Sequence, residues 1–191
     1  MHLRFKEKEM NRTHTEHKSM SLDKNRLNAA KQSLDQGSVT PESIGSRKDI
    51  IKLLNDSLAT EIVCSLRYRR HYFTATGLES ASIAEEFLIH SNEEQAHADK
   101  IANRIVQLGG EPDLNPQTLI QRSHAEYNDQ LDLHDMIRSN LIAERVAIEA
   151  YTQMIELIGN KDHTTRRIIE QILEQEQEHA DELSDWIRRA K

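Results

Sequence analysis

The sequence has little of what β-sheets, membrane spans and disulfide scaffolds require. Only 4% of its 191 residues are aromatic, and it contains one cysteine, three prolines and six glycines. Sheets favour β-branched and aromatic residues, so this composition favours long helices. Its longest apolar runs are only a few residues, which excludes a membrane-spanning helix. The single cysteine, Cys64, excludes an internal disulfide, and a reducing compartment fits best.

The N-terminal segment lacks the apolar core and small-residue cleavage site of a secretory signal. We therefore expect a cytoplasmic protein with no membrane partner. The net charge is −7, yet residues 1–31 carry eight Lys or Arg against four acids. With few large apolar residues, such a segment cannot offset the entropy lost on ordering. We expect residues 1–45 to form a mobile basic tail, followed by one helical domain over residues 46–191.

Four long segments with apolar residues at alternating steps of three and four follow the tail, and they predict an all-α four-helix bundle. Ser46 and Gly77 bound the first, Ser80 and Gly109 the second, while Gly159 ends the third and Asp162 begins the fourth. Residues 111–131 join the second and third segments. At about 3.3 Å per residue this link can run the length of the bundle, which predicts one long crossover. Its stretch "PQTLIQRSHAEY" is a candidate for a short helix.

Each predicted inward face contains an acid among its apolar residues. The four acids each lie 14 to 16 residues from the glycine or capping residue at one end of their segment, which places them at one level of the bundle: Glu61, Glu94, Glu144 and Glu176. A single such acid could be a neutral, hydrogen-bonded core residue. Four together would repel one another, and each costs on the order of several kcal/mol to desolvate. No Lys or Arg is expected on the inward faces at this level.

A repeated motif supplies the neighbours of two of these acids. The heptapeptide "EEQAHAD" at residues 93–99 recurs as "QEQEHAD" at 175–181, so that His97 follows Glu94 and His179 follows Glu176 by three positions. A Glu and a His at this spacing share one helix face and can hold the same metal. Two divalent cations would balance four carboxylates, with the imidazoles as neutral ligands. The absence of thiolate ligands favours iron, with manganese as the alternative.

This pattern, one Glu from each of two helices and Glu-x-x-His from each of the other two, is typical of ferritin-like di-iron proteins. Over about residues 46–190 the sequence resembles a bacterioferritin-type member of that superfamily. The resemblance implies that two iron ions bind per chain and that Fe(II) is oxidised by dioxygen or peroxide, for iron storage and detoxification. The implied ligands of this ferroxidase centre are Glu61, Glu94, His97, Glu144, Glu176 and His179. Which carboxylates bridge the metals is left open.

Three further positions bear on this resemblance. Tyr68 matches the tyrosine that ferritins keep beside the centre, which implies a catalytic role; a packed core aromatic with a paired hydroxyl is the alternative. His90 lies one turn before Glu94 and is interpreted either as an accessory iron site or, as favoured, a hydrogen-bonded core histidine. Gln95 stands where bacterioferritins carry their haem-ligating methionine, so we expect no haem.

The resemblance also implies a homo-oligomer, in the form of a closed cage. The sequence shows no fifth helix of the kind that lines a pore in the larger bacterioferritin cage, so we favour twelve subunits over twenty-four, with a dimer as the remaining alternative. The basic tail is similar to those of DNA-protecting starvation ferritins, which makes DNA an additional candidate partner. A di-iron or di-manganese oxidase or catalase without storage is the other alternative.

Overall fold

The computed structural model describes residues 21–32, 34, 37–39, 47–77 and 80–189. Every regular element within these ranges is a helix, which confirms the all-α prediction. The elements are α1 (Lys24–Ala29), α2 (Arg47–Thr74), α3 (Ser80–Gln107), α4 (Leu119–Arg122), α5 (Leu133–Ile158) and α6 (His163–Arg189). The four long helices correspond to the four predicted segments, and α4 lies in the stretch predicted as a short helix.

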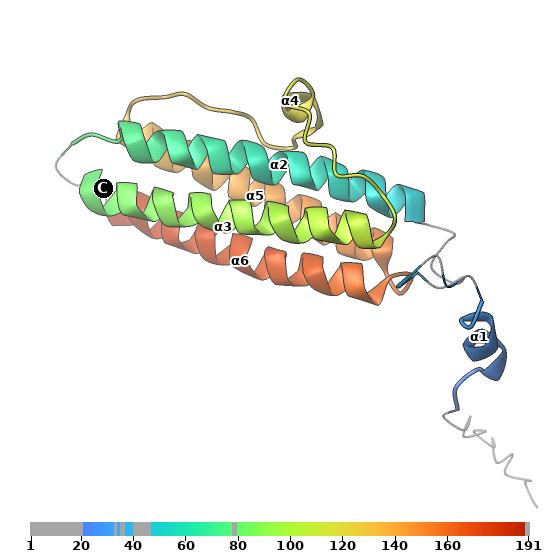
Figure 1. The fold of residues 1–191 in the computed structure, drawn as a ribbon. Helices are drawn as coiled ribbons and strands as arrows, with labels where there is room; N and C mark the ends of the chain where they lie inside the picture. The colour runs from blue at the N-terminus through green and yellow to red at the C-terminus, as the bar shows by residue number, and fades with distance from the viewer. Residues whose placement is uncertain (1–20, 33, 35–36, 40–46, 78–79, 190–191) are drawn as a thin grey trace, which may run out of the picture.

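The four long helices form a bundle of two hairpins (Figure 1). Helix α2 packs most extensively on α3, and α5 packs most extensively on α6. Residues 108–132 connect the hairpins by running from the end of α3 to the opposite end of the bundle, where α5 begins. Helix α4 lies against α2 on this path, with Leu119 packed on Ala59 and Val63. This is the predicted one-crossover topology, and it makes α2 and α5 antiparallel.

Capping residues and glycines set the helix ends close to where the sequence predicts them. Asp162 Oδ1 accepts a hydrogen bond from the Thr165 backbone N–H at 2.9 Å and so caps α6. Asp132 caps α5 in the same way by accepting from Asp135 N–H at 3.0 Å. After α5, Gly159 has φ +50°, a left-handed conformation that glycine adopts without a β-carbon clash. Local signals therefore decide where these helices start and stop.

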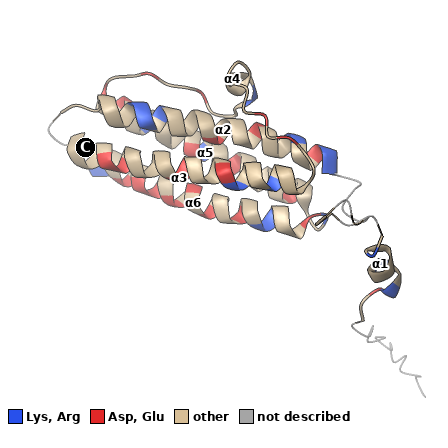
Figure 2. Cartoon of the chain, viewed as in Figure 1, with Lys and Arg blue, Asp and Glu red and all other residues tan. Residues whose placement is uncertain are grey.

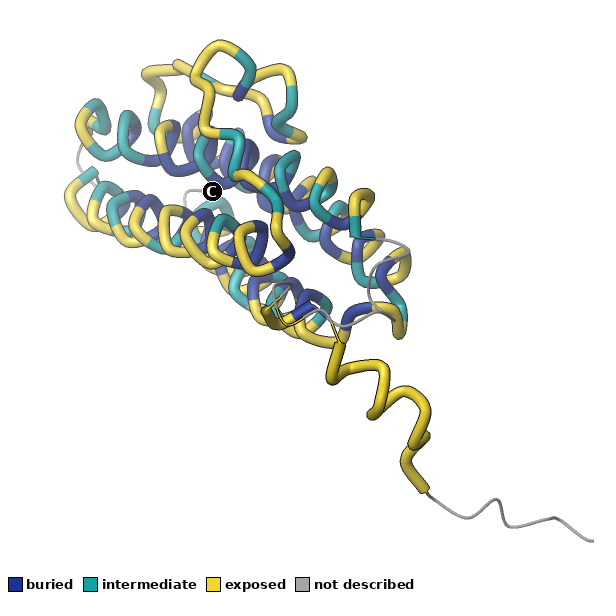
Figure 3. Tube along the Cα trace, turned by 45° about the vertical axis from the view of Figure 1, so that its right-hand side comes forward, coloured by how far each residue is buried: buried dark blue, intermediate teal, exposed yellow. Residues whose placement is uncertain are grey.

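Two apolar clusters fill the bundle on either side of a polar layer. Leu54, Leu58 and Ile101 belong to one cluster, while Phe87 and Leu183 belong to the other. Burial of each such side chain contributes about 1.5–3 kcal/mol to stability. Figure 3 shows buried positions on the inward faces of the four long helices and exposed positions outside. The burial of the two apolar clusters therefore offsets the free-energy cost of burying the polar layer between them.

The predicted tail is described only in part. Helix α1 contains no buried residue, whereas Val39 is buried and Ser38 Oγ donates a hydrogen bond to the Gln107 carbonyl at 3.4 Å. Residues 1–20 and the predicted boundary between residues 45 and 46 lie outside the described residues, so the division into tail and bundle stays a prediction.

None of the described helices combines the length and the apolar character needed to cross a bilayer. Acidic positions recur along α6 between basic positions near its two ends (Figure 2).

Candidate metal centre

The structure brings all six predicted ligands together inside the bundle. None of them is more than 3% exposed. Their ligand atoms form two groups, within each of which the atoms lie no more than 4.8 Å apart. One group consists of Glu61, Glu94, His97 and Glu176, and the other of Glu94, Glu144, Glu176 and His179. Glu94 and Glu176 belong to both groups, and the other four ligands divide evenly between the two.

Unpaired buried polar atoms concentrate in this cluster. Among the described residues, eight buried side-chain nitrogen or oxygen atoms have no hydrogen-bond partner, and six of these belong to the cluster. Both carboxylate oxygens of Glu176 are included, as is the Nδ1 atom of both His97 and His179. Each unpaired buried group costs about 1–3 kcal/mol, so native proteins retain few of them. Ligand atoms that converge in a dry core are the environment that a cation satisfies.

The only basic side chains among the carboxylates, within the described part of the chain, are the two histidines of the cluster. His97 Nδ1 lies 3.1 Å from Glu176 Oε1 and 3.3 Å from Glu61 Oε2. In the described part of the chain, no Lys or Arg forms an ion pair with any of the four acids. Arg67 is fully buried nearby on α2, but its guanidinium donates to Asn140 Oδ1 at 2.7 Å and to a crossover carbonyl at 2.9 Å. Arg67 therefore does not neutralise the cluster by direct contact.

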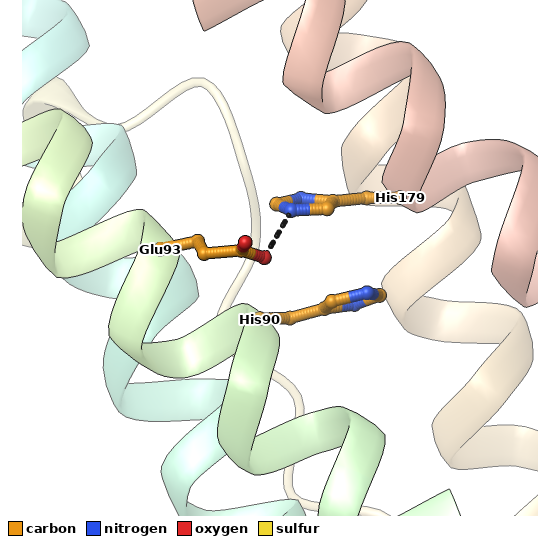
Figure 4. Close-up of side chains that lie close together, drawn as sticks. All are labelled: His90, Glu93 and His179. Carbon is orange, nitrogen blue, oxygen red and sulfur yellow. Dashed lines mark hydrogen bonds and ion pairs between the residues drawn. The ribbon is translucent and has the colours of Figure 1, made fainter.

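Each histidine is oriented by the residue that precedes the other motif. His97 Nε2 lies 3.0 Å from Gln175 Oε1, and His179 Nε2 lies 2.9 Å from Glu93 Oε2 (Figure 4). Outer contacts of this kind hold an imidazole so that its remaining nitrogen faces a metal. Gln175 and Glu93 are not among the residues predicted from the sequence. The available signal was the polar residue that stands directly before the Glu of both Glu-x-x-His motifs.

Two tyrosines hold the remaining pair of acids. The Tyr68 hydroxyl donates to Glu144 Oε1, and the Tyr151 hydroxyl donates to Glu61 Oε1. Helices α2 and α5 thus exchange equivalent hydrogen bonds across the cluster. Burial, followed by the nearby Glu144 carboxylate, raises the pKa of Tyr68 well above its ordinary value, so the phenol stays protonated and donates. Tyr68 is beside the predicted ligands with its hydroxyl paired; its catalytic role stays a prediction.

Shifted pKa values keep protons on some residues of the cluster and so reduce its negative charge. Burial and the neighbouring Glu94 carboxylate raise the pKa of Glu144 well above its usual value. Burial alone would lower the pKa of His179, but the carboxylates of Glu176 and Glu94 outweigh burial and raise it to about 12. Protons therefore occupy the cluster in the metal-free protein. Metal ions bind such ligands by displacing those protons.

The donor set fits two divalent cations. Four carboxylates and two imidazoles, with no thiolate, are the ligands that iron and manganese prefer. Residues 51–191 match the family model of the ferritin-like domain. The chain belongs to the ferritin-like family. Members of this family bind iron, and the resemblance predicted from the repeated motif is confirmed.

Bacterioferritins and nutrient stress-induced DNA-binding proteins that are similar to the chain are 25–29% identical to it over the aligned residues. A bacterioferritin of Desulfovibrio desulfuricans is 27% identical over 140 residues, covering 71% of this chain and 74% of the relative. A nutrient stress-induced DNA-binding protein of Synechococcus is 28% identical over 139 residues, covering 70% and 78%. Both branches anticipated from the sequence, bacterioferritins and starvation ferritins, are therefore represented among its relatives.

Solved structures of ferritin-like proteins superpose on the bundle. The bacterioferritin-related protein of Bacteroides fragilis, described as a dodecameric thioferritin, is 31% identical with a TM-score of 0.73, covering 75% of this chain and 87% of that one. The Desulfovibrio desulfuricans bacterioferritin, whose di-iron site is described in different catalytic states, has a TM-score of 0.68 at 22% identity, covering 78% and 84%. The latter likeness is one of fold.

Proposed function

We propose that this protein oxidises Fe(II) to Fe(III) at a paired-iron centre within one chain and stores the ferric product. The observation that carries the proposal is the convergence of six unpaired buried ligand atoms on two overlapping groups of residues. Four carboxylates with no Lys or Arg partner among the described residues match the charge of two divalent cations. A purely structural role would leave six buried polar atoms without hydrogen-bond partners.

The geometry supports a distinct role for each ligand pair. Glu61 and His97 would hold one iron, whereas Glu144 and His179 would hold the other. The carboxylates of Glu94 and Glu176 belong to both groups and would be shared by the two irons, which is the assignment that the sequence alone leaves open. Iron is the substrate here, with manganese as an alternative metal. Two ferrous ions held together can deliver two electrons to one molecule of dioxygen or peroxide.

The tyrosines and outer residues hold this centre in shape. The hydroxyl of Tyr68 donates to one oxygen of Glu144 and leaves the other oxygen for a metal, and Tyr151 does the same for Glu61. Carboxylates positioned in advance do not have to reorganise when the metal charge increases during oxidation. In addition to the ligands, Tyr68 is therefore the residue for which we propose a catalytic role.

Storage requires a closed shell, because a single bundle of this size has no interior for a mineral. The dodecameric Bacteroides fragilis relative supports a twelve-subunit shell. We expect size-exclusion chromatography with light scattering to show about twelve chains, and the same peak to retain far more than two irons per chain after aerobic loading with Fe(II). A dimer that oxidises iron but precipitates ferric oxide would refute storage and leave an oxidase.

DNA binding is a second candidate function, in addition to oxidation. The basic residues 1–31 and the Synechococcus relative, whose name records DNA binding, favour it. Phosphate contacts by Lys and Arg weaken steeply with salt. Deleting residues 1–31 should therefore abolish DNA retardation at low salt in a gel-shift assay, while the rate of iron oxidation stays unchanged. Full-length protein that fails to retard DNA even at low ionic strength would exclude this function.

A further inference from the structure

A cavity of about 270 Å³ lies where the crossover passes beside α5. None of the six predicted metal ligands lines it. Its walls include residues 124–126 and Asn128 of the crossover, Ser139 and Ile142 of α5, and Arg67 of α2. Pockets for drug-sized ligands have volumes of about 300–1,000 Å³. The cavity is therefore suited to a ligand of only a few heavy atoms.

Arg67 places a positive charge at the buried end of this cavity. The residue is 1% exposed, and among the described residues it forms no ion pair with a carboxylate. A guanidinium does not lose its proton in proteins, so burial leaves the charge in place. Arginine is almost never fully buried without a paired counter-charge, because a buried charge is costly to desolvate. An anion in the cavity would supply the missing counter-charge.

The guanidinium is held in place and still has donors available. Three of its five N–H groups have partners. Nε donates to Asn140 Oδ1 at 2.7 Å, Nη1 donates to the Glu126 carbonyl at 2.9 Å, and Nη2 lies 3.6 Å from Cys64 Sγ. Asn140 is itself held by His71, whose Nδ1 lies 3.1 Å from the amide nitrogen. The two remaining N–H groups belong to a side chain that is already oriented, so binding a ligand costs little conformational entropy.

The other polar groups of the cavity also favour an anion. Asn128 Oδ1 accepts a hydrogen bond from the Gln130 backbone N–H at 2.9 Å, which leaves the amide N–H groups of Asn128 for a ligand. Among the described residues that line the cavity, Glu126 is the one acid, and it is exposed. Water and salt screen an exposed charge much more than a buried one. The charge of Arg67 therefore outweighs that of Glu126 inside the cavity.

We propose that this cavity binds a small oxyanion, a phosphate or a carboxylate, on the guanidinium of Arg67. Guanidinium groups form strong, charge-assisted hydrogen bonds with both classes. The guanidinium also lies 5.7 Å from the ring centroid of Tyr68, whose hydroxyl donates to Glu144. An anion that offsets the charge of Arg67 should therefore strengthen metal binding at the paired centre, and metal binding should strengthen anion binding by the same factor. This coupling rests on the proposed function, whereas the anion site does not.

Calorimetric titration of metal-free, full-length protein with sodium phosphate and, separately, with sodium acetate tests the site. We expect one phosphate per chain and weaker binding of acetate, which carries less charge. R67Q removes the buried charge and S139D adds a carboxylate to the cavity wall, so each should weaken binding by at least about tenfold. The matched controls should bind as the wild type does. R69Q removes the same charge from α2 where Arg69 contacts Asn92 of α3, and T152D adds the same charge at an exposed position of α5.

The outcomes decide both the site and the class of ligand. Tighter binding of acetate than of phosphate would assign the site to a carboxylate. Failure of both anions to bind, or equal affinity in the wild type, R67Q and S139D, would overturn the site. S139D remains informative even if R67Q does not fold, because Ser139 is only partly buried.

Sulfate, which does not precipitate Zn(II), tests the coupling to the paired centre. Its affinity should be about fivefold or more higher in Zn(II)-loaded protein than in metal-free protein. Equal affinities would overturn the coupling and leave the anion site intact. A wild-type protein that binds these anions but binds no Zn(II) and oxidises no iron would instead remove the proposed function.

Discussion

Replacing Glu176 with glutamine is expected to lower the rate of Fe(II) oxidation by at least about 100-fold, since loss of an outer partner of a metal ligand alone typically costs about 10- to 100-fold. Glu176 belongs to both ligand groups, and both of its oxygens are buried and unpaired. Glutamine keeps the shape but removes the negative charge and one of the two ligand oxygens. Stopped-flow absorbance of ferric product under air measures the rate.

The matched control for this change is Glu178→Gln. Glu178 is exposed on the same helix, two positions away, so the substitution removes the same charge without touching the cluster. Its oxidation rate should equal that of the wild type. Circular dichroism of both metal-free variants verifies that each is folded. Wild-type oxidation by a folded E176Q protein would contradict the paired-iron centre.

Anaerobic Fe(II) is expected to raise the melting temperature by about 10–20 °C. A ligand that binds only the native state adds about 2.7 kcal/mol per site at a hundredfold excess over its dissociation constant, so two sites add about 5 kcal/mol. For a domain of this size each kcal/mol shifts the midpoint by about 2–4 °C. The unfolded chain has no preformed site, because the six predicted ligands come from four helices. Thermal unfolding followed by circular dichroism measures the shift.

The E176Q variant is the control for this experiment. Fe(II) should change its melting temperature only slightly. The rise in the wild type should also shrink as the pH falls, because metal ions displace protons from the cluster, including the one on His179. A wild-type midpoint that iron leaves unchanged, or a shift that saturates at one metal per chain, would contradict the paired centre.

The class of fold and the predicted ligand set follow from local patterns in the sequence. Helical periodicity is a property of each segment, and the capping signals at Asp162 and Gly159 act within a few residues. The Glu-x-x-His spacing sets two ligands on one face whatever the rest of the chain does. The position of each acid along its helix follows from the number of residues between it and the helix end. These features are therefore readable without any tertiary contact.

The tertiary structure decided how side chains from different helices meet. Three features depend on how α3 is rotated and shifted against α6. Glu94 and Glu176 are shared between the two groups, Gln175 orients His97, and His90 stacks on His179. The exchange of hydrogen bonds between α2 and α5 depends on their antiparallel register in the same way. A slide of one turn, about 5.4 Å, would preserve every sequence pattern and break each of these contacts. Packing of the two apolar clusters selects a single register, and the chemistry of the centre follows from that choice.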